Sequence, residues 1–175
     1  MTNLLEIAQL GNPVLRNKTS VVTGINHSIV QLIEDMKWTV NTVNGVGIAA
    51  PQVFESKRIY VIASKPNERY PNAPYLEPVA MINPEIKELS NELEKEWEGC
   101  LSIPGIRGLV PRSKELVIEY TNQAGKKIIK KYSDFIARVI QHEFDHLEGI
   151  MFLDRLESNK DLVSEFEYQR IITGK

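Results

Sequence analysis

The chain has 175 residues, of which 42% are hydrophobic and 25% charged, a composition typical of one globular domain spanning residues 1–175. The net charge of −2 gives no indication of general nucleic-acid binding, which usually needs a basic face, and no apolar run approaches the ~20 residues that cross a membrane. A lone cysteine cannot form an internal disulfide, and the first residues lack a signal-peptide pattern, so we expect a cytoplasmic protein. The absence of heptads or an apolar surface stripe favours a monomer.

The first part of the chain predicts an irregular or extended arm followed by a helix. The arm covers residues 1–23 and is broken by Gly-Asn-Pro at 11–13. Apolar residues then recur at helical spacing over 28–43, and the Asn-Gly pair at 44–45 ends that helix.

The middle of the chain has the patterns of β-strands and turns. Strands are expected over 58–64, 79–83, 115–121 and 126–131. A proline-rich loop over 66–78 separates the first two strands, and a polar, mostly extended stretch covers 84–97. The last two strands form a hairpin across the turn at 122–125.

A second helix is predicted between the N-cap Ser133 and the terminating Gly149, with Asp134 in its first turn. Its apolar residues cover more than one side: Phe135, Ile136, Val139, Ile140, Phe144 and Leu147. Its polar edge consists of Arg138, Gln141, Asp145 and Glu148. So wide an apolar arc indicates a central buried helix, with antiparallel or mixed sheets packed around it in an α+β fold. A weaker helical pattern covers 161–170.

The sequence His142-Glu143-Phe144-Asp145-His146 lies on this buried helix. Two histidines four residues apart lie on one helix face and can bind a single metal ion. A single buried histidine is more often a hydrogen-bonded core residue. Three ionisable groups in a core, however, need a partner, and a metal ion supplies one.

The natural third ligand is Cys100, although a lone cysteine is usually a small buried hydrophobe. Gly99 before it allows close backbone approach, and residues 102–105 turn the chain. One thiolate and two imidazoles suit zinc or ferrous iron, and the sequence does not choose between them.

An open coordination position distinguishes a catalytic from a structural metal site. The third histidine, His27, lies at the edge of the first helix, where it caps the helix or faces solvent. A carboxylate could fill the fourth position, but we favour an open one. A metal ion would then lower the pKa of bound water and polarise a carbonyl, with Glu143 as general base. The alternative role of Glu143 is that of an anion orienting a ligand.

Three segments together resemble the motifs of the peptide deformylase family. They are Gly45-Val46-Gly47-Ile48-Ala49-Ala50-Pro51-Gln52, Glu98-Gly99-Cys100-Leu101-Ser102 and Gln141-His142-Glu143-Phe144-Asp145-His146-Leu147. Their order, content and separation all match. The glycine-rich segment alone is a weak signal, whereas the full set is highly specific.

The resemblance implies a role for each motif. Cys100, His142 and His146 would hold the metal, and Glu143 would be the acid–base residue. The Gln52 side-chain amide and the Leu101 backbone N–H would donate to the oxyanion. Otherwise Gln52 caps the turn after Pro51 and Leu101 packs in the core.

The resemblance also implies that the substrate is the N-terminal formyl-methionine of newly made chains, whose formyl group is removed. The peptide would lie as an added strand against Val46-Gly47 and Gly99. Candidates for the apolar methionine pocket are Val46, Phe135 and Val139, each of which could equally be ordinary core. Arg107 would touch the peptide backbone, and a solvated arginine is the alternative.

The family implies one divalent ion per chain, with Fe(II) as the native metal and Zn(II), Ni(II) or Co(II) as substitutes. Arg138 lies beside the expected pocket, where an apolar residue would be unsurprising, so the pocket shape at that edge stays open. One family subtype contacts the ribosome through a C-terminal helix. The short, weakly basic tail here leaves contact with the ribosome near the exit tunnel open.

Two other functions compete with this interpretation. A metal endopeptidase shares the helix motif, although a thiolate ligand and the segment ending in Gln52 argue against it. A non-catalytic, metal-stabilised binding module predicts a fourth protein ligand and no need for Glu143. Hydrolysis of a formylated dipeptide, but not of an internal peptide bond, would separate the first alternative from a deformylase.

Overall fold

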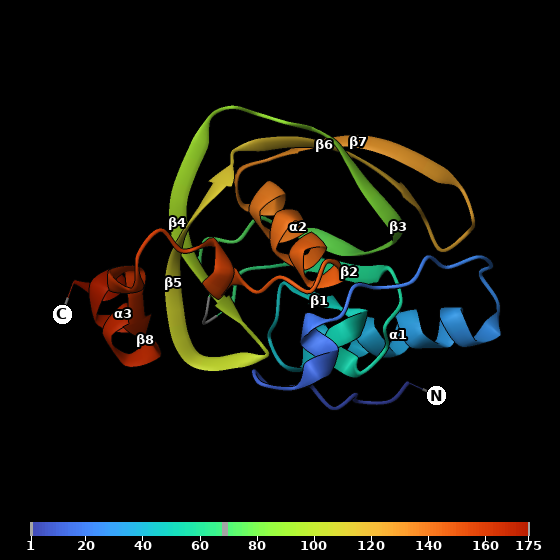
Figure 1. Cartoon of the computed structure of the whole chain (residues 1–175), viewed down its shortest axis with the longest axis horizontal. Coiled ribbons are helices and arrows are strands. Elements are labelled where there is room, and N and C mark those ends of the chain that lie inside the picture. Colours follow the sequence, from blue (N-terminus) through green and yellow to red (C-terminus); the bar gives the residue numbers. More distant parts are fainter. Residues whose placement is uncertain (1, 68–69, 175) are drawn as a thin grey trace.

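The computed structural model describes residues 2–67 and 70–174 and has an α+β fold (Figure 1). The α-helices of this part are α1 (His27–Thr42), α2 (Asp134–Leu147) and α3 (Glu165–Thr173). The strands are β1 (Gly47–Ala49), β2 (Ile59–Ser64), β3 (Leu76–Leu89), β4 (Leu93–Cys100), β5 (Ile103–Ser113), β6 (Glu115–Thr121), β7 (Lys127–Ser133) and β8 (Leu162–Ser164). Short 3-10 helices are η1 (Pro13–Arg16), η2 (Ala50–Val53), η3 (Phe152–Arg155) and η4 (Asn159–Asp161).

Two antiparallel sheets surround α2, as the sequence predicts. One sheet has the strand order β1-β2-β3-β6-β7, and the other has the order β4-β5-β8. Helix α2 contacts strands of both sheets and lies inside the arch that they form in Figure 1. The side of the first sheet that faces α1 has its own apolar core. Helix α2 therefore has little contact with solvent and can hold polar groups away from water.

Helix α1 matches the helix expected over 28–43. Its N-cap is Asn26, whose side chain accepts a hydrogen bond from the Ile29 N–H, so a donor of the first turn is satisfied. Asn44, with φ of 53°, takes the left-handed conformation just after the helix. The chain can therefore turn at once into β1, which carries part of the glycine-rich motif.

Helix α2 also lies where it was predicted, but its polar residues do not form a solvated edge. Arg138, Gln141 and Asp145 are all buried. Gln141 bonds to both the N–H and the carbonyl of Ser113, so it ties the helix to the end of β5. Ser133 occupies the N-cap position, but its side chain makes no capping hydrogen bond.

The strands of the second half differ in extent from the prediction. Strand β3 runs over 14 residues instead of 79–83, because pairing with β6 resumes after irregularities near Asn83 and Pro84. Strand β5 was missed. It contains Pro104 and Pro111 as well as two glycines, which argue locally against a strand. Its pairing with β4 over most of its length overrides that preference.

The N-terminal arm is bonded to two of the segments that carry the motifs. The arm is extended apart from η1, and Ala8 and Leu10 donate backbone hydrogen bonds to the carbonyls of Gln52 and Ser102. The tail expected as a helix over 161–170 instead forms η4 and β8 before α3 begins. Residue 1 and residues 68–69 of the predicted loop lie outside the described part. None of the described helices is both long and apolar enough to cross a membrane.

Candidate metal centre and adjoining pocket

The three expected metal ligands lie together at one point of the fold. Cys100 ends β4, while His142 and His146 lie one turn apart on α2. One ligand atom from each lies within 4.8 Å of the others, and all three residues are buried. The Cys100 Sγ is 3.4 Å from the His146 Nε2. A buried set of one sulfur and two imidazole nitrogens fits a divalent ion such as zinc or ferrous iron.

Glu98 fixes the orientation of His142. The His142 Nδ1 lies 2.9 Å from the Glu98 Oε2, which leaves Nε2 as the nitrogen available to a metal. Burial alone would raise the pKa of Glu98, but the Arg112 guanidinium and the hydrogen bond with His142 hold it well below its usual value. Glu98 is therefore an anion that orients a ligand.

Two arginines complete the charge balance around Glu98. Arg112 donates to both carboxylate oxygens at 2.9 and 3.0 Å, and Arg138 donates to Oε1 at 2.9 Å. Arg112 also reaches Asp145, which in turn pairs with Arg155. Removing one partner from such a buried network leaves an uncompensated charge, so these residues act as one unit.

Glu143 lies beside the ligands with one carboxylate oxygen unpaired. It is 4% exposed, and its Oε2 is one of the buried polar atoms of the described residues that have no hydrogen-bond partner. Burial raises the pKa of Glu143 to about 7. A carboxyl group with such a pKa can both accept and return a proton near neutral pH.

Gly47 makes room for this carboxylate. A Cβ atom at Gly47 would lie only 2.8 Å from the Glu143 Cγ and closer still to the carboxylate. The backbone of β1 and the Glu143 side chain can therefore approach each other only because residue 47 has no side chain.

Gln52 presents its amide nitrogen to the same region. Its Oε1 accepts the Ala49 N–H at 2.8 Å, and its Nε2 lies 3.5 Å from the Cys100 Sγ and 3.2 Å from the Ser102 Oγ. The Gln52 Oε1 thus caps the turn, as the alternative interpretation of this residue expected. The Gln52 NH2 group points toward the sulfur of Cys100. Leu101 follows Cys100 in the tight turn between β4 and β5.

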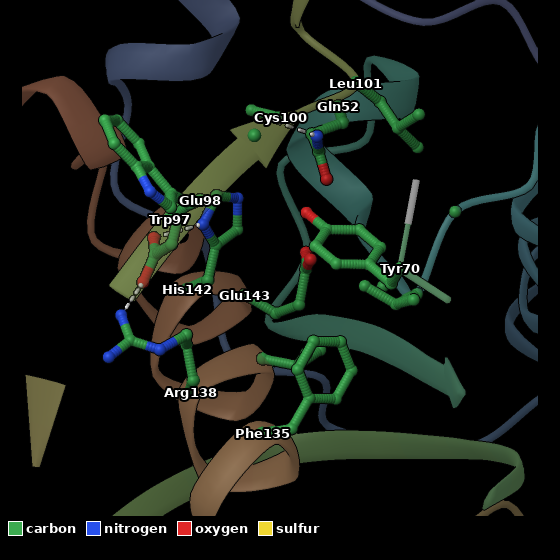
Figure 2. A pocket seen from close by; sticks show the side chains of 15 residues that line it. Gln52, Tyr70, Trp97, Glu98, Cys100, Leu101, Phe135, Arg138, His142 and Glu143 are labelled. Carbon is green, nitrogen blue, oxygen red and sulfur yellow. Dashed lines mark hydrogen bonds and ion pairs between the residues drawn. The ribbon is translucent and has the colours of Figure 1, made fainter. Parts of the chain in front are cut away.

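A pocket opens beside these groups (Figure 2). Its lining residues include the peptide-edge candidates and the apolar candidates: Val46, Gly47, Gly99, Phe135 and Val139. Gln52, Leu101, Cys100, His142 and Glu143 also line it. Arg138 borders the pocket, and its guanidinium is turned away to Glu98 and to the carbonyls of Glu94 and Val110.

Arg107 is buried, so the solvated alternative is wrong: the residue is 0% exposed. It is not among the described residues that line the pocket, and its contact with a peptide backbone stays a prediction. Its guanidinium pairs with Glu165 of α3. His27, by contrast, is exposed at the start of α1.

Sequence reasoning missed part of the pocket and most of the ion-pair network. Tyr70 and Trp97 line the pocket, and no local pattern distinguishes them from other aromatic residues. The ion pairs of Arg138 and Asp145 could have been anticipated from the sequence, because charged residues on a helix buried on most sides must find partners of opposite charge.

The comparisons with known proteins agree with this geometry. Residues 4–162 match the sequence model of the family described as polypeptide deformylase. The chain is 53% identical over 171 residues to peptide deformylase 2 of Nostoc sp., which covers 97% of this chain and 96% of that protein. A class I type b peptide deformylase from Acinetobacter baumannii, solved with Met-Ala-Ser bound, superposes with a TM-score of 0.87 at 42% identity. That match covers 89% of this chain and 100% of the other. The peptide deformylase of Thermotoga maritima superposes with a TM-score of 0.80 at 38% identity, over 89% of this chain and 99% of the other.

Proposed function

The chain belongs to the polypeptide deformylase family and is a hydrolase that removes the formyl group from the N-terminus of nascent peptides, and we propose which of its residues perform this reaction. One observation carries the proposal. The buried Oε2 of Glu143, which has no hydrogen-bond partner in the described part of the chain, lies next to a buried cluster of one thiol and two imidazoles.

Cys100, His142 and His146 would hold one divalent ion, and Glu98 would keep His142 in the ligating orientation. When bound, the ion would lower the pKa of a water molecule and polarise the formyl carbonyl. Fe(II) is the proposed native ion, with Zn(II), Ni(II) or Co(II) as substitutes, because the thiolate and imidazole donors suit all four.

Glu143 would take a proton from the attacking water and return it to the departing amine. The pKa of about 7 that burial gives its carboxyl group supports both transfers at neutral pH. The position of Gly47 also supports this role of Glu143, since the close approach of β1 leaves the Glu143 carboxylate little freedom to move away from the ligand cluster.

The Gln52 side chain and the Leu101 N–H would stabilise the oxyanion of the tetrahedral intermediate. Gln52 is suited to this role because Ala49 fixes its oxygen and so leaves its NH2 group as a pre-oriented donor. Both donors are neutral, so they stabilise the developing charge without adding a net charge to the resting site.

The formylated peptide would lie as an extended strand between Val46-Gly47 and Gly99. The methionine side chain would enter the pocket beside Phe135 and Val139, which is supported by the position of these residues in its lining. We further propose that the enzyme acts as a cytoplasmic monomer on formyl-methionyl nascent chains, either free or near the ribosome.

Replacement of Glu143 by alanine tests the proposal. The variant should still bind one metal ion but release formate from formyl-Met-Ala-Ser about 100- to 10,000-fold more slowly, the usual contribution of a general base. Glu148→Ala is the control, because Glu148 caps the end of the same helix outside the pocket. Retained turnover by metal-loaded Glu143→Ala would remove Glu143 from the mechanism.

A further inference from the structure

The C-terminal helix α3 packs behind the pocket without entering it. It begins at Glu165, beyond residue 162, where the match to the family ends. Ser164 caps it by accepting the Glu167 N–H. Its buried residue is Tyr168. Helix α3 contacts β5 and lies on the outer side of that strand in Figure 1.

Glu165 holds the buried Arg107 by two parallel hydrogen bonds. The Arg107 Nε is 2.7 Å from Oε2 of Glu165, and Nη2 is 3.1 Å from Oε1. A fully buried guanidinium needs an opposite charge, and the paired geometry also fixes the plane of the group. Glu165 therefore determines where the remaining nitrogen, Nη1, points.

That nitrogen supports the wall of the pocket. The Arg107 Nη1 donates to the Tyr70 hydroxyl at 3.0 Å, and a Cβ atom at Gly99 would lie 2.8 Å from the same nitrogen. Tyr70 in turn packs edge-on against Phe135, with 5.3 Å between ring centroids. Tyr70, Gly99 and Phe135 all line the pocket, and Figure 2 shows Tyr70 and Phe135 among the side chains that face it.

A second contact from α3 reaches another lining residue, Trp97. Tyr168 packs edge-on against Trp97 at 5.9 Å. The Arg107 guanidinium also lies over the Tyr168 ring, 4.6 Å from its centroid. Two lining residues, Tyr70 and Trp97, are thus connected to Arg107 and α3.

We propose that Glu165 is a positioning residue for peptide binding: through Arg107 it holds Tyr70 and Gly99 in the geometry that receives the formyl-methionyl peptide. The proposal rests on the proposed function of the pocket. Without the carboxylate, the guanidinium loses its counter-charge and its fixed plane, so Tyr70 loses its hydrogen-bond donor. Because neither Glu165 nor Arg107 is among the ligand cluster or the described lining residues, binding should suffer and the chemical step should not.

The test compares Glu165→Gln with Glu167→Gln in the metal-loaded enzyme. Glu167 is the matched control, since it lies on the same helix, is exposed and, among the described residues, has Arg170 on its own helix as its ion-pair partner. For formyl-Met-Ala-Ser, Glu165→Gln should raise KM roughly three- to tenfold, because a partly exposed charged hydrogen bond is lost. The kcat should stay within about twofold of the wild type. Glu167→Gln should change neither constant.

A Tyr70→Phe variant shows whether the effect passes through Arg107. Tyr70→Phe should raise KM by a similar factor, and the double variant should show less than the product of the two factors, because both changes break one chain of contacts. Any one of three results would overturn the proposal. The KM of Glu165→Gln could be unchanged, the two increases in KM could multiply fully in the double variant, or the loss could be confined to kcat. A purely structural role would lower the melting temperature and leave KM unchanged.

A spectroscopic readout separates this proposal from the proposed function. The chain has two tryptophans, so Trp38→Phe leaves Trp97 as the only one, and Trp38 is itself 52% exposed on α1. In that background Glu165→Gln should shift the Trp97 emission to longer wavelength as the contact with Tyr168 loosens, whereas Glu167→Gln should not. If the wild type releases no formate, the proposed function fails, and the emission alone decides whether α3 holds this wall. An unchanged emission would then overturn the inference.

Discussion

Replacing Glu143 with glutamine should slow deformylation about 100- to 10,000-fold and, at the same time, stabilise the metal-free protein at neutral and alkaline pH. Burial raises the pKa of Glu143 from 4.5 to about 7, so the folded state holds this proton more tightly than the unfolded state. The stability from the protonated form is complete below pH 4.5 and is lost as the pH rises through about 7. At about 1.4 kcal/mol per pKa unit, the ionised carboxylate costs roughly 3 kcal/mol above pH 8. Glutamine cannot ionise and avoids this cost.

Urea unfolding of the chelator-treated proteins at pH 5 and pH 8 measures the effect. The variant should exceed the wild type in free energy of unfolding by about 2–3 kcal/mol at pH 8 and by less than about 1 kcal/mol at pH 5. With a metal ion bound, the difference should shrink, because the cation offsets the charge of the carboxylate. A difference that is the same at both pH values would show that burial of the Glu143 charge has no energetic consequence.

Three further substitutions test the surroundings of the site. Gly47→Ala should lower kcat/KM about 100-fold with the fold intact by circular dichroism, because its Cβ would displace Glu143; full activity would show that the close contact is irrelevant. Cys100→Ser should lose metal or change its metal preference in elemental analysis, and unchanged content and selectivity would count against the thiolate as a ligand. Glu98→Gln should weaken zinc binding about 10- to 100-fold in a competition titration, since it frees His142 and leaves buried arginines without their anion. Wild-type affinity would contradict the role given to Glu98.

The parts of the site that depend on local spacing could be predicted from the sequence. His142 and His146 lie one turn apart in any helix, and the apolar arc around them indicates burial wherever that helix packs. The two strong helices and the hairpin of β6 and β7 follow from periodicity and turn residues for the same reason.

The parts that depend on distant pairing could not be predicted. Glu98 meets Arg112 across 14 residues and Arg138 across 40, and Arg107 meets Glu165 across 58. No periodic pattern encodes such pairs. Strand β5 was missed for a related reason, since its prolines and glycines are tolerated only through pairing with β4.

The ligand set is tested most directly by X-ray absorption at the metal edge of the anaerobically loaded protein. We expect one sulfur at about 2.3 Å, two imidazole nitrogens at about 2.0–2.1 Å and a light, exchangeable ligand in the remaining position. A spectrum without sulfur, or one in which a further side chain closes the coordination sphere, would contradict this ligand set.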